Sequence, residues 1–270
     1  MSFYTSLSGM RNAETDLRVI SNNIANAETA GFKKSNAQFT DLVATGGSTD
    51  PRVTPGIGAA VSGITQDFGL GQIEQTGRVL DVAITGDGFL AVANPISGDV
   101  TFTRNGNLEL VATGELQTKS GDLVQAFPVD ANGNATSNIP ANVVVPTVNA
   151  AGSALSSISI DARGIVGANY SDGSSEPVAM VALASFPATG GLRPIGQTKW
   201  EATADSGLPQ YGEPGVGNLG QLMSGALERS NVDLAEEMVS LLTAQRNFQA
   251  NARAIDTATA ISQTVLNLQR

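Results

Sequence analysis

The chain has 270 residues, of which 41% are hydrophobic and 15% charged, a composition that supports one or two domains with an apolar core and argues against disorder throughout. The net charge of −10, from 15 Lys and Arg against 25 Asp and Glu, argues against a phosphate-binding surface and hence against a nucleic-acid partner. The lack of cysteine and histidine excludes disulfides, thiolate metal sites and a Ser–His–Asp hydrolase.

Residues 1–30 are predicted to form the first helix. Apolar residues recur there at steps of three and four, close to heptad spacing, without a proline, and Gly31 is a plausible stop signal. The stripe consists of Phe3, Leu7, Met10, Ala13, Leu17, Ile20, Ile24 and Ala27. The same segment has neither the basic start nor the apolar centre of a signal peptide. The apolar run at residues 178–184 is too short to span a membrane, which leaves a cytosolic protein or one exported without a cleaved signal.

Residues 31–63 are rich in Gly, Thr and Pro, which predicts an extended connector rather than a compact element. From residue 64 to residue 204 the chain consists of short, β-branched segments separated by turn residues, as at residues 79–92 and 157–167. Strands at such close spacing predict a central all-β domain. Phe186 and the single Trp200 are predicted to anchor its core.

A second connector is predicted at residues 205–230. A second helix is predicted at residues 231–270, a segment that contains neither Gly nor Pro. Asp233 and Glu236 have the spacing of a capping box at the start of this helix. The heptad position at 245 is occupied by glutamine. The apolar stripe consists of Leu234, Met238, Leu241, Phe248, Ala252, Ile255, Ala258, Ile261, Val265 and Leu268.

The sequence therefore predicts an α+β protein in which two terminal helices flank a β domain. Both helical stripes need a partner, and two arrangements remain open. The helices form a local antiparallel hairpin on the β domain, or they are buried against other copies of the chain. A long stretch of small and polar positions, such as Asn22, Asn23 and Asn26, suits an assembly with several contact faces.

Motifs that carry chemistry are weak in this sequence. Gly56 and Gly58 follow no hydrophobic strand and lack the third glycine of a dinucleotide-binding loop. The segment 130–134 resembles a calcium loop, but its spacing fits a β-turn better. Residues 104–107 are predicted to form a hairpin turn. Because no nucleophile, base and oxyanion donor come together, we expect neither an enzyme nor a cofactor or metal.

Seven segments, in order along nearly the whole chain, resemble bacterial flagellar rod and hook proteins. They are SNNIANAETAGFK (21–33), GITQDF (63–68), TGRVLDVAI (76–84), GDGF (86–89), RNG (104–106), GALERSNVDLAEE (225–237) and AQRNFQAN (244–251). Within the family the resemblance is greatest to hook proteins, through residues 63–68, 164–173 and 230–234. One departure is that hook proteins carry an additional outer β domain, for which only residues 130–156 leave room. The chain length resembles the distal-rod subunit instead.

The resemblance implies that the terminal helices form a discontinuous coiled coil in an inner layer, around an export channel, with the β domain outside it. It implies a structural subunit that polymerises into the tubular hook and transmits torque, or alternatively into the rigid distal rod. Implied partners are further copies of the chain, the distal-rod, hook-cap and hook–filament junction proteins, and the type III export apparatus. The implied location is the hook or basal body, outside the cell after export.

The resemblance also implies which residues make the polymerisation interface. They are Phe3, Leu7, Met10, Leu17, Ile20, Ile24, Leu234, Met238, Leu241, Phe248, Ile255, Ile261 and Val265.

Two alternatives from other classes are a secreted β-domain adhesin, which predicts ordered termini in the monomer, and an enzyme, which predicts a deep pocket with perturbed carboxylates.

Overall fold

A computed structural model describes residues 2–43 and 56–268 of the chain. Each of its two compact units is built from segments that are distant in the sequence. We call the first the helical unit, made of Met1–Ala27, Lys34–Asp67 and Val232–Arg270. We call the second the β unit, made of Glu28–Lys33 and Phe68–Asn231. The expected α+β class is confirmed, since a helix near each end of the chain flanks a strand-rich middle.

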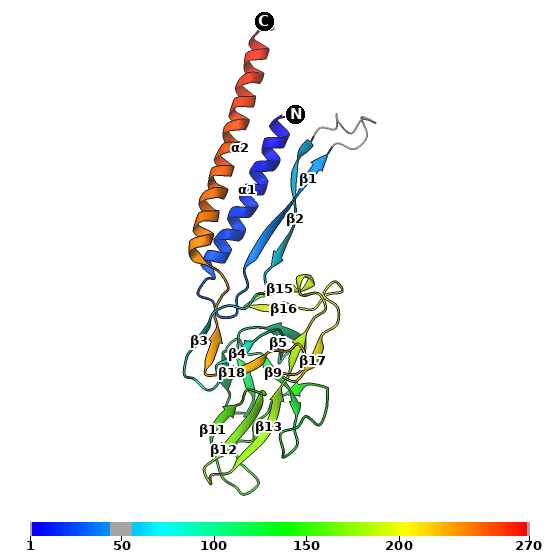
Figure 1. Ribbon diagram of the computed structural model, residues 1–270, viewed down its shortest axis with the longest axis vertical. Coiled ribbons are helices and arrows are strands. Elements are labelled where there is room, and N and C mark those ends of the chain that lie inside the picture. The colour runs from blue at the N-terminus through cyan, green and yellow to red at the C-terminus, as the bar shows by residue number, and fades with distance from the viewer. Residues whose placement is uncertain (1, 44–55, 269–270) are drawn as a thin grey trace. The chain divides into compact units, whose positions relative to one another are not determined.

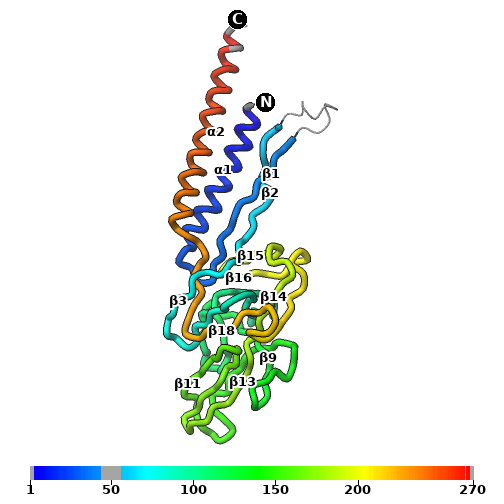
Figure 2. The backbone as a smooth tube through the Cα atoms, viewed as in Figure 1, coloured from blue at the N-terminus to red at the C-terminus, as the bar shows by residue number. Residues whose placement is uncertain are grey.

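The helical unit contains α1 (Ser2–Ala25) and α2 (Leu234–Leu268), which lie side by side and run in opposite directions (Figures 1 and 2). Their contact is close. A Cβ added to Gly9 of α1 would lie 2.6 Å from the Asn251 side-chain oxygen of α2. The local antiparallel pairing that the sequence left open is therefore present within one chain, and Ala13, Ile20 and Ala244 are buried within the helical unit. No helix in the described part of the chain is long and apolar enough to cross a membrane.

A β-hairpin lies along α1, where the sequence predicted an extended connector over residues 31–63 (Figure 1). Strands β1 (Ser35–Val43) and β2 (Gly56–Gln66) pair antiparallel, from Ser35 opposite Gln66 to Val43 opposite Gly56. The composition of this stretch hid the strands, because its Gly, Thr and Pro residues are typical of turns and connectors. Residues 44–55 of the expected connector lie outside the described residues.

The β unit is formed by short antiparallel strands. The first half comprises β3 (Ile73–Gln75), β4 (Val82–Thr85), β5 (Phe89–Ala93), β6 (Val100–Thr103), β7 (Leu108–Leu110), β8 (Leu116–Thr118), β9 (Leu123–Pro128) and β10 (Ala141–Asn142). The second half comprises β11 (Leu155–Ile160), β12 (Ile165–Tyr170), β13 (Ser175–Val181), β14 (Leu183–Ser185), β15 (Arg193–Gly196), β16 (Lys199–Glu201), β17 (Gln210–Gly212), β18 (Gln221–Ser224) and β19 (Ala226–Glu228), with a 3₁₀ turn η2 (Thr189–Gly191).

The main sheet has the strand order β11-β12-β13-β9-β5-β6-β16-β15. One core cluster combines aliphatic residues of β4, β9, β12 and neighbouring strands, and an aromatic cluster gathers around Phe89. Trp200 and Phe186 belong to the aromatic cluster and are 2% and 9% exposed, so the prediction that they anchor the core is confirmed.

The predicted connector at residues 205–230 lies entirely within the β unit. It contributes β17, which pairs with β14, then β18, which pairs with β4, and β19, which pairs with β3. These strands are three or four residues long, too short for an alternating pattern to stand out in the sequence. The chain thus returns through the β unit before α2 begins.

Candidate assembly surface and its polar junctions

The structure places the predicted interface residues of the two helices in different environments. Ile20 is buried, whereas Leu7, Met10, Leu17, Ile24, Leu241, Phe248 and Ile255 are half-buried. Phe3, Leu234, Met238 and Ile261 are exposed by 42%, 43%, 50% and 60%. The side chain of Val265 lies outside the described residues. The helix pair thus covers only part of the predicted set and leaves the rest at its surface.

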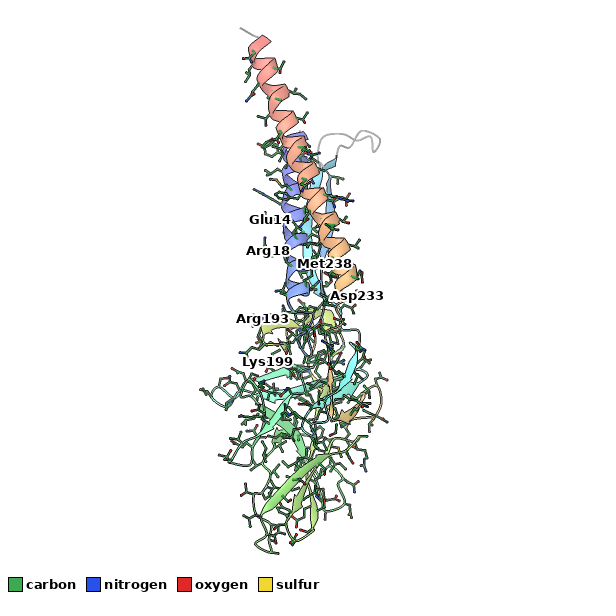
Figure 3. The ribbon with its side chains drawn as sticks, turned by 90° about the vertical axis from the view of Figure 1, so that its left-hand side faces the viewer. Glu14, Arg18, Arg193, Lys199, Asp233 and Met238 are labelled. Atoms are coloured by element: carbon green, nitrogen blue, oxygen red, sulfur yellow. The ribbon has the colours of Figure 1, made fainter. Side chains whose placement is uncertain are left out.

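Helix α2 has two apolar faces. Its α1-facing side contains Leu241, the buried Ala244, Phe248 and Ile255, which recur at helical spacing. A second side, which we call the outer face, begins with Leu234, Met238, Val239 and Leu242, exposed by 43% to 65% (Figure 3 labels Met238). Apolar exposure of this kind, at consecutive positions of one helix side, is typical of an interaction surface.

The start of α2 is capped as the sequence predicted. The Asp233 carboxylate accepts hydrogen bonds from the backbone N–H of Ala235 at 2.8 Å and of Glu236 at 3.2 Å. These bonds satisfy two donors that have no partner inside the helix. The Glu236 carboxylate, expected to reach back toward Asp233, lies instead 3.4 Å from the Lys34 ammonium.

A polar junction joins three elements of the helical unit at the foot of α2. The side-chain amide of Asn23 donates to the Ser35 carbonyl at 2.8 Å and accepts from the Ser35 N–H at 2.9 Å. The same amide donates to Glu237 at 3.2 Å, and Glu237 pairs with Lys34 at 2.8 Å. Asn23 and Glu237 are 1% and 2% exposed. This junction fixes the end of α1, the start of β1 and the first turn of α2 to one another.

A cavity of about 320 Å³ adjoins this junction and is lined by Asp16, Glu236, Glu237 and Lys34 together with Val239. Partial burial, and then the neighbouring Glu237 charge, raise the pKa of Asp16 above its ordinary value. The hydrogen bond to Glu237 raises the pKa of Lys34, against the opposing effect of desolvation. The foot of the helix pair is therefore an acidic patch with one ammonium group in it.

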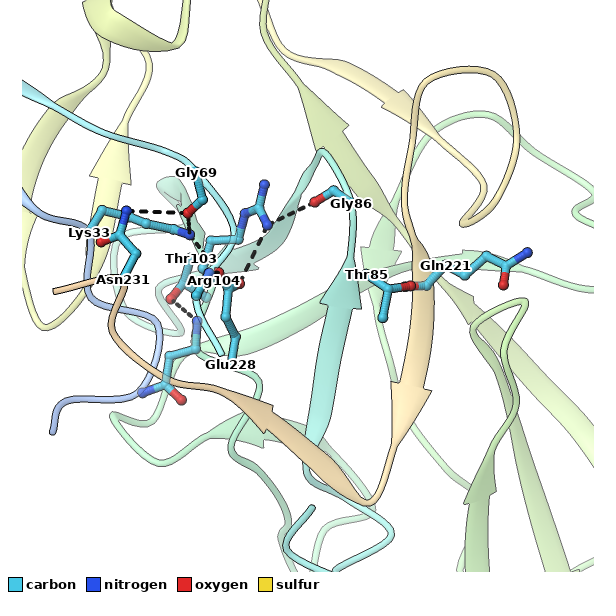
Figure 4. Close-up of polar contacts among 11 residues, drawn as sticks. Lys33, Gly69, Thr85, Gly86, Thr103, Arg104, Gln221, Glu228 and Asn231 are labelled. Atoms are coloured by element: carbon cyan, nitrogen blue, oxygen red, sulfur yellow. Dashed lines mark hydrogen bonds and ion pairs between the residues drawn. The ribbon is translucent and has the colours of Figure 1, made fainter. Parts of the chain in front are cut away.

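A second polar junction is buried in the β unit (Figure 4). Glu228, at the end of β19, is 1% exposed and lies between Lys33, whose ammonium is 2.5 Å away, and Arg104, at 3.4 Å. The Glu228 carboxylate also accepts the Gly71 N–H at 2.9 Å, and Lys33 donates to the Gly69 carbonyl at 2.7 Å. Each charge thus has an opposite partner and further hydrogen bonds, as a buried ion pair requires.

Arg104 and Gly31 complete this junction. Burial lowers the pKa of Arg104, and the Glu228 charge opposes that shift, while its guanidinium stacks over Phe89 with 5.1 Å between the guanidinium carbon and the ring centroid. Gly31 donates its N–H to the Glu228 carbonyl at 2.8 Å and has a φ of +71°. A Cβ at Gly31 would lie 2.6 Å from the Asn105 nitrogen, so only glycine fits.

The prediction of a hairpin turn at residues 104–107 is wrong. β6, which precedes this segment, pairs with β5 and β16, whereas β7, which follows it, pairs with β8. Arg104 points into the junction instead, and a Cβ at Gly106 would lie 1.7 Å from the Val82 carbonyl oxygen. The segment 130–134 does form the expected turn, in which Asp130 accepts the N–H groups of Asn132 and Asn134.

Three flagellar family models match successive parts of the chain. "Flagella basal body rod protein" covers residues 3–33, "Flagellar hook protein FlgE/F/G D1 domain" residues 83–168, and "Flagellar basal body rod FlgEFG protein C-terminal" residues 223–268. The chain is 36% identical over 282 residues to the flagellar basal-body rod protein FlgG of Bacillus subtilis, covering 100% of this chain and 99% of that protein. The chain belongs to the flagellar rod and hook protein family.

Further relatives include both rod proteins and hook proteins. The FlgG rod protein of Borreliella burgdorferi is 32% identical over 282 residues, covering 100% of this chain and 98% of that protein. The flagellar hook protein FlgE of Salmonella typhimurium is 28% identical over 411 residues, covering 100% of both chains. As a member of this family, the chain is a structural protein of the bacterial flagellum, located in its hook or basal body.

The family resemblance pointed to the segments that contain the two junctions, but not to the junctions themselves. Lys33 and Glu228 lie in the segments 21–33 and 225–237, and Arg104 lies in the RNG segment. Nothing in the spacing of these residues indicates a contact, because 195 positions separate the two ends of the Lys33–Glu228 pair. The sequence offered only a weak signal for these junctions, namely charged residues at unexpected positions. Lys33 follows Gly31-Phe32, and Arg104 begins the predicted turn at residues 104–107, so both are charged residues at positions where turn residues were expected.

Proposed function

We propose that this chain polymerises, through its terminal helices, into the axial tube of the flagellum. The observation that carries the proposal is the outer face of α2, where Leu234, Met238, Val239 and Leu242 stay exposed although α2 is already paired with α1. Further apolar residues are exposed at Phe3 and along the hairpin, at Phe39 and Ile64. So much apolar surface on a slender helical unit is best accounted for by contact with further copies.

The rod is the axial segment that the chain lengths favour. The alignment with the Bacillus subtilis FlgG rod protein spans 282 residues and needs few gaps in a 270-residue chain. The alignment with the Salmonella FlgE hook protein spans 411 residues, so much of the hook protein has no counterpart here. A subunit without that additional mass offers fewer outer contacts that slide during bending, which suits a straight drive shaft.

The hook is the second candidate, and the motifs at residues 63–68 and 164–173 favour it. In that role the chain is a short hook subunit that transmits motor torque through a flexible joint. In both roles the tube encloses the export channel, and the subunits reach their place through the type III apparatus. The partners we propose are neighbouring axial proteins, namely the distal rod, hook cap or hook–filament junction proteins. We propose a mechanical role without catalysis.

Immunogold electron microscopy of intact hook–basal bodies from the native cell tests the assignment. Antibody against this chain is expected to label the straight shaft within the cell envelope. Label along a curved segment outside the outer membrane would assign the hook instead. Absence of label from the whole axial structure, while the antibody detects the chain elsewhere in the same cells, would refute an axial role and favour the adhesin alternative.

A further inference from the structure

The outer face of α2 changes character along the helix. Its first turns carry the exposed apolar residues Leu234, Met238 and Leu242. Two exposed arginines follow, Arg246 and Arg253, which are seven residues apart and therefore lie on the same side of the helix. Neither guanidinium is in an ion pair with any residue that the structure describes. The face is thus apolar at one end and basic further along.

The opposite charge lies at the foot of the same helix pair. Asp16, Glu236 and Glu237 line the cavity of about 320 Å³ with a single ammonium, that of Lys34. Glu236 remains 66% exposed although it pairs with Lys34. Val239 of the outer face also lines this cavity, so the acidic patch is continuous with the apolar part of the face. The helix pair therefore carries complementary charges at two heights along its axis.

We propose that the outer face of α2 docks on a second copy of this chain, parallel to the first and displaced along the helix axis, so that its arginines meet the acidic foot of that copy. This inference rests on the proposed polymerisation and names its contact and register. Glu236 is 10 residues from Arg246 and 17 from Arg253. At about 1.5 Å per residue, the displacement is about 15 Å or about 26 Å.

The direction of pairing decides whether such a contact grows. A parallel, displaced contact uses two different patches and leaves one of each free, so that copies add without limit. An antiparallel contact would also bring the arginines of each copy to the acidic patch of the other. It would use both patches of both copies at once and therefore form a closed dimer. Exposed ion pairs contribute little affinity, so the apolar residues supply the attraction and the charges set the register.

Cysteine cross-linking tests the register directly, because the natural chain contains no cysteine. We would prepare the purified full-length double variants Glu236→Cys/Arg246→Cys and Glu236→Cys/Arg253→Cys, with the three single variants as controls. Within one copy the paired positions are about 15 Å or about 26 Å apart along the helix, beyond the roughly 7 Å that a disulfide can bridge. Any disulfide between positions 236 and 246 or 253 therefore joins two copies.

The expected result under oxidising conditions is a ladder of dimers, trimers and longer species for one double variant, and at most dimers for each single variant. The variant that gives the ladder identifies the displacement. Dimers alone from both double variants would show a closed pair and overturn the parallel arrangement. Absence of any cross-link, while the wild-type chain sediments as a polymer, would overturn this contact and leave the proposed function intact. A wild-type chain that does not sediment as a polymer, together with double variants that form no cross-link, would refute both.

Charge reversal adds a measurement that needs no cysteine. With the displacement of about 26 Å, Arg253→Glu is expected to raise the protein concentration at which half of the chain sediments by about tenfold, equivalent to about 1.4 kcal/mol. Combining it with Glu236→Arg should restore most of the loss. Arg163→Glu, an equal change of charge at an exposed turn of the β unit, serves as the matched control. Arg246→Glu is the corresponding test of the shorter displacement, and effects of both variants no larger than that of Arg163→Glu would overturn the contact.

Discussion

Replacing Glu228 by glutamine should destabilise the β unit strongly. The substitution keeps the shape of the side chain and an acceptor for the Gly71 N–H, but removes the negative charge that pairs with both Lys33 and Arg104. Two cations then remain in a site where all three side chains are 3% exposed or less. Breaking a buried ion pair on one side typically costs about 3–5 kcal/mol, a large part of the 5–15 kcal/mol that stabilises a typical domain.

Urea unfolding monitored by tryptophan fluorescence measures this cost, because the single Trp200 is buried in the aromatic cluster of the β unit. Lys33→Met should cost less than Glu228→Gln, since it leaves the balanced pair of Glu228 with Arg104. Glu74→Gln is the matched control, because Glu74 is 58% exposed and its pairing with Arg229, at 3.5 Å, contributes about 1 kcal/mol at most. A Glu228→Gln cost no larger than that of Glu74→Gln would refute the role assigned to the junction.

Four further predictions concern single positions. Leu241→Asp places a charge on the α1-facing side of α2, and should abolish sedimentation as a polymer while the tryptophan unfolding transition stays unchanged. Asp233→Ala removes the cap of α2 and should lower the thermal stability of the helices by about 0.5–2 kcal/mol, measured by circular dichroism. Gly31→Ala should cost more than about 1 kcal/mol in urea unfolding, because of its positive φ and the adjacent backbone. Gly190→Ala, with open space around it and an ordinary φ, should cost little. Asp16→Asn should stabilise the helices near pH 7 by up to about 1 kcal/mol. Because the pKa of Asp16 is raised in the folded state, the ionised Asp16 carboxylate destabilises the fold, and this cost develops as pH rises from the ordinary pKa of aspartate through the raised one. The stabilisation by Asp16→Asn should therefore vanish below about pH 4, where Asp16 is protonated in both states, as measured by melting at different pH values.

The sequence predicted the parts of this fold that repeat a pattern. Helical stripes of eight or more apolar residues located α1 and α2, and Asp233 was placed as a cap, because these signals extend over several turns or follow a fixed local spacing. The strands β1 and β2 were missed because glycine and threonine dominated the composition of residues 31–63. Turn residues such as Asp130 could be predicted, since their hydrogen bonds reach only two to four positions.

Long-range polar contacts were beyond such reasoning. Asn23 was interpreted as one of several small polar positions that suit an assembly, yet its amide is committed to Ser35 and Glu237 inside the helical unit. Arg104 was likewise interpreted from its local sequence alone, as a turn residue, because Asn-Gly follows it. A single sequence records neither burial nor the partner of a charge, so a buried ion and a solvated one look identical until the fold brings distant segments together.

Both junctions draw on the same two sequence segments, 21–33 and 225–237, which are also the two longest segments of the family resemblance. The first segment supplies Asn23 to the helical unit and Lys33 to the β unit, and the second supplies Glu237 to the helical unit and Glu228 to the β unit. Each unit is assembled from separate stretches of chain, and in each a carboxylate from the second segment is bound by a side chain from the first. Under the proposed assembly, the apolar helix faces are buried between copies, so they do not direct the folding of the single copy. The buried polar pairs favour the native arrangement of the single copy instead, because any other arrangement that buried Glu228 or Glu237 without a partner would be costly.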